Sequence, residues 1–146
     1  PGDLDYIHSV ERISRLSNVI SINGGVQLDL MGQENAESTG TRQLSGVGGQ
    51  MDFLEGAYRS KGGKGFICIN SSRVTKDGER KSNILATIPG GSTISAPRTM
   101  IQYVATEYGI ASLSGKTLRE RAEAMASIAH PDFREELMKY AQENFK

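Results

Sequence analysis

The chain has 146 residues, and its 17 basic and 17 acidic side chains give a formal net charge of zero. Neutrality argues against a nucleic-acid surface and against broad electrostatic attraction to membranes, because both need an excess of basic residues. No secretory signal is visible, and the apolar runs are only a few residues long, too short to span a bilayer. We therefore expect one domain over residues 1–146 in the cytoplasm, with no nucleic-acid or membrane partner.

The first half of the chain predicts two strands and a helix. Residues 19–22 (VISI) are typical of a buried strand, and residues 26–30 (VQLDL) of an alternating one. The Asn-Gly-Gly between them predicts a tight turn or bulge. Residues 31–45 are polar and predict a loop. Apolar side chains at helical spacing predict a helix over residues 50–59.

The second half predicts further strands and two helices. The expected strands cover residues 65–70, 83–88 and 100–106. Residues 71–82 predict a solvated loop. Thr117 and Glu120 have capping-box spacing, so a helix begins there. Pro131 suits the first turn of a last helix, and His130 reads as its cap. Strands mixed with amphipathic helices predict an α/β fold, an open mixed sheet flanked by helices.

The glycines gather in clusters beside apolar runs. Glycine accounts for 17 of the 146 residues, a share well above the average glycine content of roughly 7%. In the cluster SGVGGQ, residues 45–50, backbone amides at the start of a helix can form an anion site or an oxyanion hole. The alternative is a tight turn with close packing. The spacing fits neither a dinucleotide fingerprint nor a P-loop.

A few reactive side chains are further candidates. Lys76 lies in a polar loop, where it can meet a ligand phosphate or simply be solvated. Glu107 directly follows an apolar strand, and strand ends are where α/β proteins place chemistry; the alternative is a surface ion pair. His8 and His130 lack metal-ligand spacing, so no metal site is predicted. The single cysteine, Cys68, lies in an apolar run and is expected to be a buried thiol.

Five segments spread through nearly the whole chain carry a resemblance to known proteins: SINGGVQLDLMGQ (21–33), SGVGGQMDFLEGA (45–57), SKGGKGFICI (60–69), YVATEYGIASLSGKTLRERA (103–122) and IAHPDFREEL (128–137). In these segments, and in their order, the chain resembles the C-terminal part of the acetyl-CoA hydrolase/transferase family, which includes acetate, butyrate, succinate and 4-hydroxybutyrate CoA-transferases. The resemblance implies two related α/β halves with open sheets of the ribose-phosphate-isomerase-like kind. This chain resembles most of the second half.

The resemblance also implies a ping-pong mechanism with coenzyme A as a substrate and no cofactor. A glutamate attacks the acyl-CoA to form an anhydride, and the CoA thiolate then forms an enzyme glutamyl-CoA thioester. In the family that glutamate precedes the SINGGV-like stretch, and Glu11, Glu34 and Glu37 lie in a different context. Because no glutamate of this chain matches that motif, we expect a C-terminal domain of a longer enzyme, inactive by itself; the first residue, Pro1 rather than methionine, fits an excised or processed piece. A separate subunit is the alternative.

Residue by residue, the resemblance implies roles for a small set of positions. It marks Val26, Gly49 and Lys76 as CoA contacts. It marks the backbone amides of Gly48 and Gly49 as the oxyanion hole. It places Asn23 and Glu107 beside the reacting acyl group. The expected function is CoA transfer between an acyl-CoA and a short-chain carboxylate, with the N-terminal half of the same enzyme as partner. The resemblance is also compatible with a homodimer. The alternatives are an acetyl-CoA hydrolase of the same family, a non-catalytic CoA-binding subunit, and a phosphosugar-binding domain.

Overall fold

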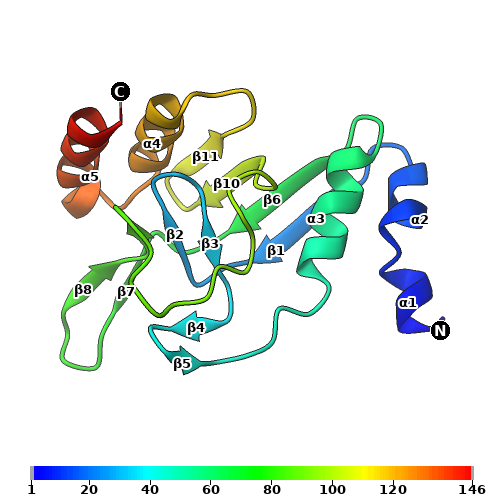
Figure 1. Ribbon diagram of the computed structural model, residues 1–146. Coiled ribbons are helices and arrows are strands. Elements are labelled where there is room, and N and C mark those ends of the chain that lie inside the picture. The colour runs from blue at the N-terminus through cyan, green and yellow to red at the C-terminus, as the bar shows by residue number, and fades with distance from the viewer. Residues whose placement is uncertain (1, 146) are drawn as a thin grey trace.

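The computed structural model describes residues 2–145 (Figure 1). Its helices are α1 (Leu4–Ile7), α2 (Val10–Arg15), α3 (Gln50–Arg59), α4 (Leu118–Ser127) and α5 (Pro131–Asn144). Its strands are β1 (Ile20–Gly24), β2 (Gln27–Asp29), β3 (Glu34–Asn35), β4 (Ser38–Thr39), β5 (Arg42–Gln43), β6 (Lys64–Cys68), β7 (Ser72–Val74), β8 (Arg80–Ser82), β9 (Ile84–Leu85), β10 (Tyr103–Thr106) and β11 (Gly109–Ser112). None of these helices is both long enough and apolar enough to cross a bilayer.

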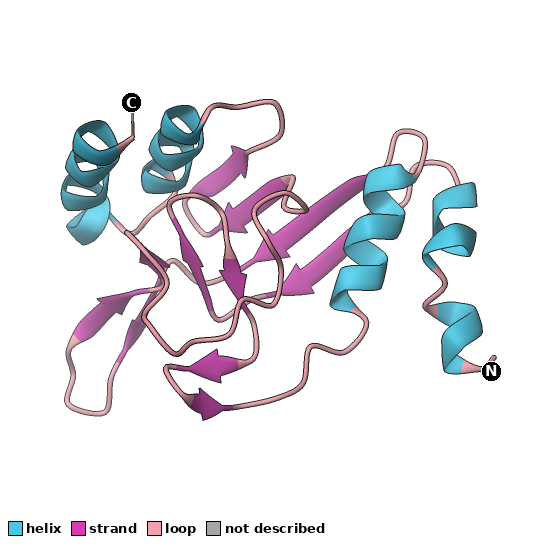
Figure 2. Cartoon of the chain, viewed as in Figure 1, coloured by secondary structure: helices cyan, strands magenta, loops and turns pink. Residues whose placement is uncertain are grey.

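The main sheet has four strands in the order β1-β6-β10-β11. The first three strands are parallel, and β11 returns antiparallel to β10. Figure 2 shows these strands side by side between two groups of helices, α1–α3 at one end and α4–α5 at the other. The predicted α/β class, an open mixed sheet flanked by helices, is confirmed.

The core lies on one face of this sheet. Ile67 and Val104 point into it from β6 and β10, and both are fully buried. They join Leu54 of α3 and Met125 of α4 in one apolar cluster. A second, three-stranded sheet, β3-β2-β9, contributes the fully buried Leu28. The helices therefore cover the face of the main sheet that carries the core.

The helix predictions are confirmed. Helix α3 has the predicted bounds. The capping box at α4 is present, since the Thr117 hydroxyl accepts from the Glu120 amide while the Glu120 carboxylate accepts from the Thr117 amide. Pro131 opens α5, and the ring of His130 accepts a hydrogen bond from the Asp132 amide. Local side-chain contacts therefore mark where α4 and α5 begin, whereas α3 begins after Gly49 without a side-chain cap.

Several strand predictions are wrong in detail. The tight turn or bulge expected at residues 23–25 is replaced by the end of β1, which includes Asn23 and Gly24, and the chain then passes from the main sheet into the second one. The predicted loop at 31–45 contains β3, β4 and β5, and the one at 71–82 folds as the hairpin β7–β8. The expected strands at 83–88 and 100–106 shorten to β9 and β10. Strand β11 was not predicted.

Cys68 is exposed rather than buried, which corrects the expectation for this thiol. The physical reason is that β6 buries alternate residues only: Gly65 and Ile67 face the core, while Cys68 faces the opposite side. An apolar run therefore does not mean that both faces of this strand are covered. The same alternation occurs in β1.

Candidate functional site

The carboxyl ends of β1, β6 and β10 meet at one edge of the sheet, because the three strands are parallel neighbours. A hollow of about 420 Å³ opens there. Its lining residues are Gly25, Cys68, Ile69, Asn70, Ala105 and Thr106. Such an edge is where open α/β sheets bind ligands. A larger open groove of about 650 Å³ runs along α5, and its lining contains none of the predicted site residues.

Glu107 lies directly after β10, beside this hollow. Ser71, which follows the end of β6, donates its backbone amide to Glu107 Oε2 at 2.9 Å and its hydroxyl to Oε1 at 2.6 Å. Partial desolvation acts to raise the pKa of Glu107, but these two bonds, together with nearby His130, outweigh it and hold the pKa below its ordinary value. Glu107 is therefore a fixed, ionised carboxylate at the sheet edge.

The segment that carries Ser71 is itself held firmly. Asn83 donates its side-chain amide to the carbonyl of Asn70 at 2.9 Å, and its backbone amide to the carbonyl of Ser71 at 2.8 Å. The guanidinium of Arg73 donates in turn to the Asn83 side-chain oxygen at 2.6 Å. Ser71 is fully buried. Glu107 is thus positioned by a segment that has little freedom to move.

Asn23 and Val26 lie at the same edge, on the β1 side. Asn23 is half-buried near the end of β1, and its side-chain amide donates to the hydroxyl of Ser21 at 2.8 Å. Val26 is half-buried just beyond, with its backbone amide bonded to the carbonyl of Asn35 at 2.9 Å. Strand β6 separates Asn23 from Glu107. The structure therefore brings these predicted residues to one edge without direct contact.

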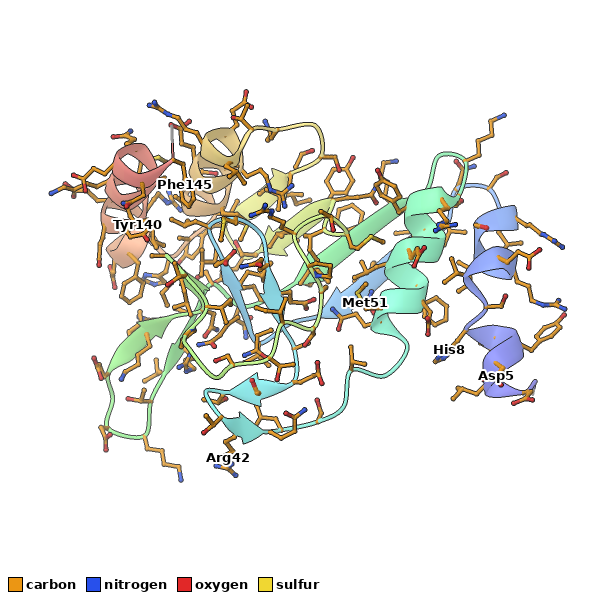
Figure 3. The ribbon with its side chains drawn as sticks, in the orientation of Figure 1. Asp5, His8, Arg42, Met51, Tyr140 and Phe145 are labelled. Carbon is orange, nitrogen blue, oxygen red and sulfur yellow. The ribbon has the colours of Figure 1, made fainter. Side chains whose placement is uncertain are left out.

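Gly48 and Gly49 lie at the N-terminus of α3. Gly48 has a φ of +58°, a left-handed conformation that favours glycine, and a side chain there would meet open space. A side chain at Gly49 would instead collide with the ring of His8. Figure 3 shows His8 between α1 and α3. Within residues 2–145 neither glycine amide donates a hydrogen bond, so both remain available to an oxyanion.

Lys76 is exposed in the turn of the β7–β8 hairpin. Its ammonium makes no ion pair or hydrogen bond in the described part of the chain. The hairpin extends away from the main sheet (Figure 1). Among the predicted site residues, Lys76 is therefore the one that lies away from the sheet edge with the hollow.

Glu34 is an unexpected part of the site, because its carboxyl is fully buried. Its Oε2 accepts a hydrogen bond from the side-chain amide of Gln50, while Oε1 has no partner. Burial raises the pKa of Glu34 to about 8, and the bond from Gln50 opposes this only in part. Glu34 is therefore a neutral acid at pH 7. Its polar sequence context predicts a solvated loop, so no sequence signal marks it.

The Glu34 side chain connects the two parts of the site. A Cβ at Gly25, which lines the hollow, would lie 2.6 Å from Glu34 Oε1, so only a glycine fits over the carboxyl. Gln50 is the first residue of α3, directly after Gly49. A series of contacts, from Gly25 to Glu34 and from Glu34 to Gln50, thus links the hollow at the strand ends to the N-terminus of α3, where the amides of Gly48 and Gly49 are free.

A family model described as the acetyl-CoA hydrolase/transferase C-terminal domain matches residues 2–141. The chain belongs to this family. Its members among curated proteins include the butyryl-CoA:acetate CoA-transferase of Anaerostipes caccae, which is 47% identical over 139 residues. That match covers 95% of this chain and 31% of the relative.

Other members carry related names. The 4-hydroxybutyrate coenzyme A transferase of Clostridium kluyveri is 47% identical over 142 residues, covering 97% of this chain and 32% of the relative. An acetyl-CoA hydrolase of Eremothecium gossypii is 33% identical over 135 residues, covering 91% of this chain and 24% of the relative. The chain therefore spans about a third or less of the length of these curated relatives.

Solved structures agree with the family assignment. RipA from Yersinia pestis superposes with a TM-score of 0.83 at 40% identity, over 95% of this chain and 30% of that protein. The 4-hydroxybutyrate CoA-transferase from Porphyromonas gingivalis superposes with a TM-score of 0.75 at 40% identity, over 97% of this chain and 30% of that protein. The chain therefore has a fold that is also found in a solved CoA-transferase structure.

Proposed function

We propose that this chain forms the CoA-binding and oxyanion-stabilising side of a CoA-transferase, which moves CoA between an acyl-CoA and a free carboxylate. The observation that supports it most is the ionised Glu107, held by both donors of Ser71 beside the hollow at the strand ends. Family membership supplies the reaction class. The nucleophilic glutamate is assigned to the N-terminal part of the enzyme, because the relatives are much longer than this chain.

The proposed reaction needs no redox step and no net transfer of protons. The glutamate carboxylate attacks the thioester carbonyl carbon, the C–S bond breaks, and CoA leaves as a thiolate with the formation of an acyl-glutamyl anhydride. The thiolate then attacks the glutamyl carbonyl of the anhydride and expels the acyl group as a carboxylate. An incoming carboxylate reverses both steps. Each step passes through a tetrahedral oxyanion.

Each part of the site has a task in this scheme. The free amides of Gly48 and Gly49 stabilise the oxyanion, since fixed donors need no reorganisation when the charge develops. Glu107 orients the reacting groups as a fixed hydrogen-bond acceptor, and Asn23 lies at the same edge, on the far side of β6. Val26 borders the path of the CoA arm. Lys76, exposed in the turn of the β7–β8 hairpin, binds the CoA phosphates.

The test uses the enzyme assembled with its N-terminal part, assayed with butyryl-CoA and acetate. Glu107→Gln keeps the size of the side chain but removes its charge, and we expect at least about a 100-fold loss of turnover. Glu135→Gln, an exposed acid on α5, is the matched control and keeps its rate. A Glu107→Gln enzyme within threefold of the wild type would overturn the proposed role.

Hydrolysis of acetyl-CoA is a second candidate, favoured by the named hydrolase among the relatives. The covalent steps are shared, and water replaces the incoming carboxylate. Release of free CoA from acetyl-CoA in the absence of any other carboxylate identifies a hydrolase. Release that depends on added carboxylate, with formation of a new acyl-CoA, identifies a transferase.

A further inference from the structure

One face of the main sheet has no cover within residues 2–145. Side chains that point away from the core alternate with buried ones on every strand of the sheet. On β1, Ile20 is 51% exposed and Ile22 is 68% exposed, and on β11 Ile110 is 63% exposed. We call this the open face, and its apolar members are Ile20, Ile22, Phe66, Cys68, Tyr103, Ala105 and Ile110.

These side chains form one continuous surface, as the strand register shows. Ile22 pairs with Phe66, and Phe66 pairs with Tyr103. The rings of Phe66 and Tyr103 stack at a centroid distance of 4.9 Å. In the next row, Cys68 pairs with Ala105, and Ala105 pairs with Ile110. The first row is apolar on β1, β6 and β10 and ends at Ser112 of β11, and the second is apolar on β6, β10 and β11 and begins at Gly24 of β1. The two rows together place apolar side chains on all four strands.

Such a surface is unusual for this kind of sheet. Parallel strands are normally buried on both faces, because their crossover helices pack against each side. Here α3 and α4 pack on the core face only. A contiguous apolar patch on a soluble protein marks a surface that binds another part of a protein. A polar cover would leave these side chains without apolar contacts, so the occupant must itself be apolar.

The occupant is identified by two observations. The family model describes a C-terminal domain, and the curated relatives extend well beyond the region that matches this chain. In addition, Cys68 and Ala105 belong both to the open face and to the lining of the strand-edge hollow. A cover over Cys68 and Ala105 therefore also reaches the rim of the hollow, whose lining includes Thr106, the neighbour of Glu107 in the sequence.

We propose that the open face docks apolar helices from the N-terminal part of the same enzyme, and that this contact brings the N-terminal part to the strand-edge hollow. The second clause rests on the proposed function, because it gives the nucleophilic glutamate its route to the thioester. Helices are the expected partners because a layer of helices on a sheet completes the α/β architecture.

Cys68 provides a direct test, since it is the single cysteine of the chain and lies on the open face. The rate of maleimide labelling is followed on the tryptic peptide of residues 65–73, both for this chain alone and for the enzyme with its N-terminal part. We expect labelling of Cys68 to slow at least tenfold in the complete enzyme. Equal rates in the two proteins would overturn the proposal.

A pair of substitutions tests the same surface through assembly. Ile22→Asp places a charge on the β1 side of the open face, at a side chain that is 68% exposed, whereas Val74→Asp makes the same kind of change at a residue of β7 that is 59% exposed. Circular dichroism first establishes that both variants fold. We expect binding of the separately produced N-terminal part to weaken at least tenfold for Ile22→Asp only. Equal binding by the two variants would contradict the proposal.

Sedimentation of this chain alone tests the competing occupant, a second copy of the chain. Self-association that Ile22→Asp abolishes, with assembly onto the N-terminal part left intact, would overturn the proposal in favour of a homodimer. A monomer supports it. These measurements require no turnover, so a failure of the open face is distinguishable from a failure of the assigned role of Glu107.

Discussion

Ser71 donates two hydrogen bonds to the carboxylate of Glu107, one from its backbone amide and one from its hydroxyl. The two residues are 36 positions apart in the sequence and follow two neighbouring parallel strands. Ser71 is fully buried, whereas Glu107 is exposed. A rigid, buried donor thus fixes a carboxylate that stays accessible to a ligand.

Replacing Ser71 by alanine tests this relationship. Ser71→Ala removes the hydroxyl but keeps the backbone donor, so the pKa of Glu107 should rise toward its ordinary value. Because the ionised form is the active one in this account, the acidic limb of the pH profile of kcat/KM should move to higher pH. Ser72→Ala, whose hydroxyl contacts Arg80, is the control and keeps the profile. An unchanged acidic limb in Ser71→Ala would argue against a working role for the ionised carboxylate.

Glu34 makes the stability of the chain depend on pH. Its pKa is about 8 in the folded state, against an ordinary value of 4.5, so the folded chain holds a proton that the unfolded chain has lost. The free energy of unfolding should therefore fall as the pH rises from 4.5 to about 8, by up to about 1.4 kcal/mol per pH unit, and then level off. Urea unfolding at a series of pH values measures this slope.

Glu34→Gln should remove most of that slope, because the amide has no proton to lose. Glu136→Gln, an exposed acid on α5, controls for the change in net charge and should keep the slope. Parallel slopes in wild type and Glu34→Gln would show that the buried carboxyl does not carry the effect.

Arg121 holds three segments together at the base of α4. Its guanidinium donates to the carbonyls of Met31, Arg98 and Leu113, each at 2.8 Å, and the residue is only 8% exposed. Arg121→Ala should lower the free energy of unfolding by about 3 kcal/mol or more, because it leaves buried carbonyl groups without donors. Arg119→Ala on the same helix loses only an exposed pair with Glu123, and should cost less than about 1 kcal/mol. Comparable losses in the two variants would refute this role.

Position 49 needs a glycine because the ring of His8 occupies the space of a Cβ atom there, and not because of the backbone angles of Gly49. A methyl group at this position would strike the ring, so Gly49→Ala should displace either His8 or the start of α3. We expect a loss of about 1–3 kcal/mol in stability, together with reduced turnover in the complete enzyme. His8→Ala in the same chain removes the obstacle and should restore part of both. The double-mutant cycle measures the coupling, and purely additive effects would exclude the collision.

The helices could be predicted because their signals are local. The capping box of Thr117 and Glu120, and the placement of Pro131 after His130, act within a few residues. The second sheet could not be predicted, because β3 consists of the polar pair Glu34 and Asn35. Their burial depends on partners that only the folded chain supplies.

The strand-end position of Glu107 followed from the sequence, but its partner did not. Ser71 lies in a stretch that predicts a solvated loop, and only the parallel pairing of β6 with β10 brings it to the carboxylate. The exposure of Cys68 was also missed. An apolar run gives no sign of whether one or both faces of its strand are covered within the chain.

The most direct test of the central claim is thioester exchange, measured with acetyl-CoA and a second carboxylate. It compares this 146-residue chain alone with the same chain joined to the N-terminal part of its enzyme. We expect exchange only in the longer protein, because this chain provides the oxyanion and CoA side but no nucleophile. Exchange by the short chain alone would contradict it. A nucleophile would then lie within these residues, and Glu107 would be the first one to test.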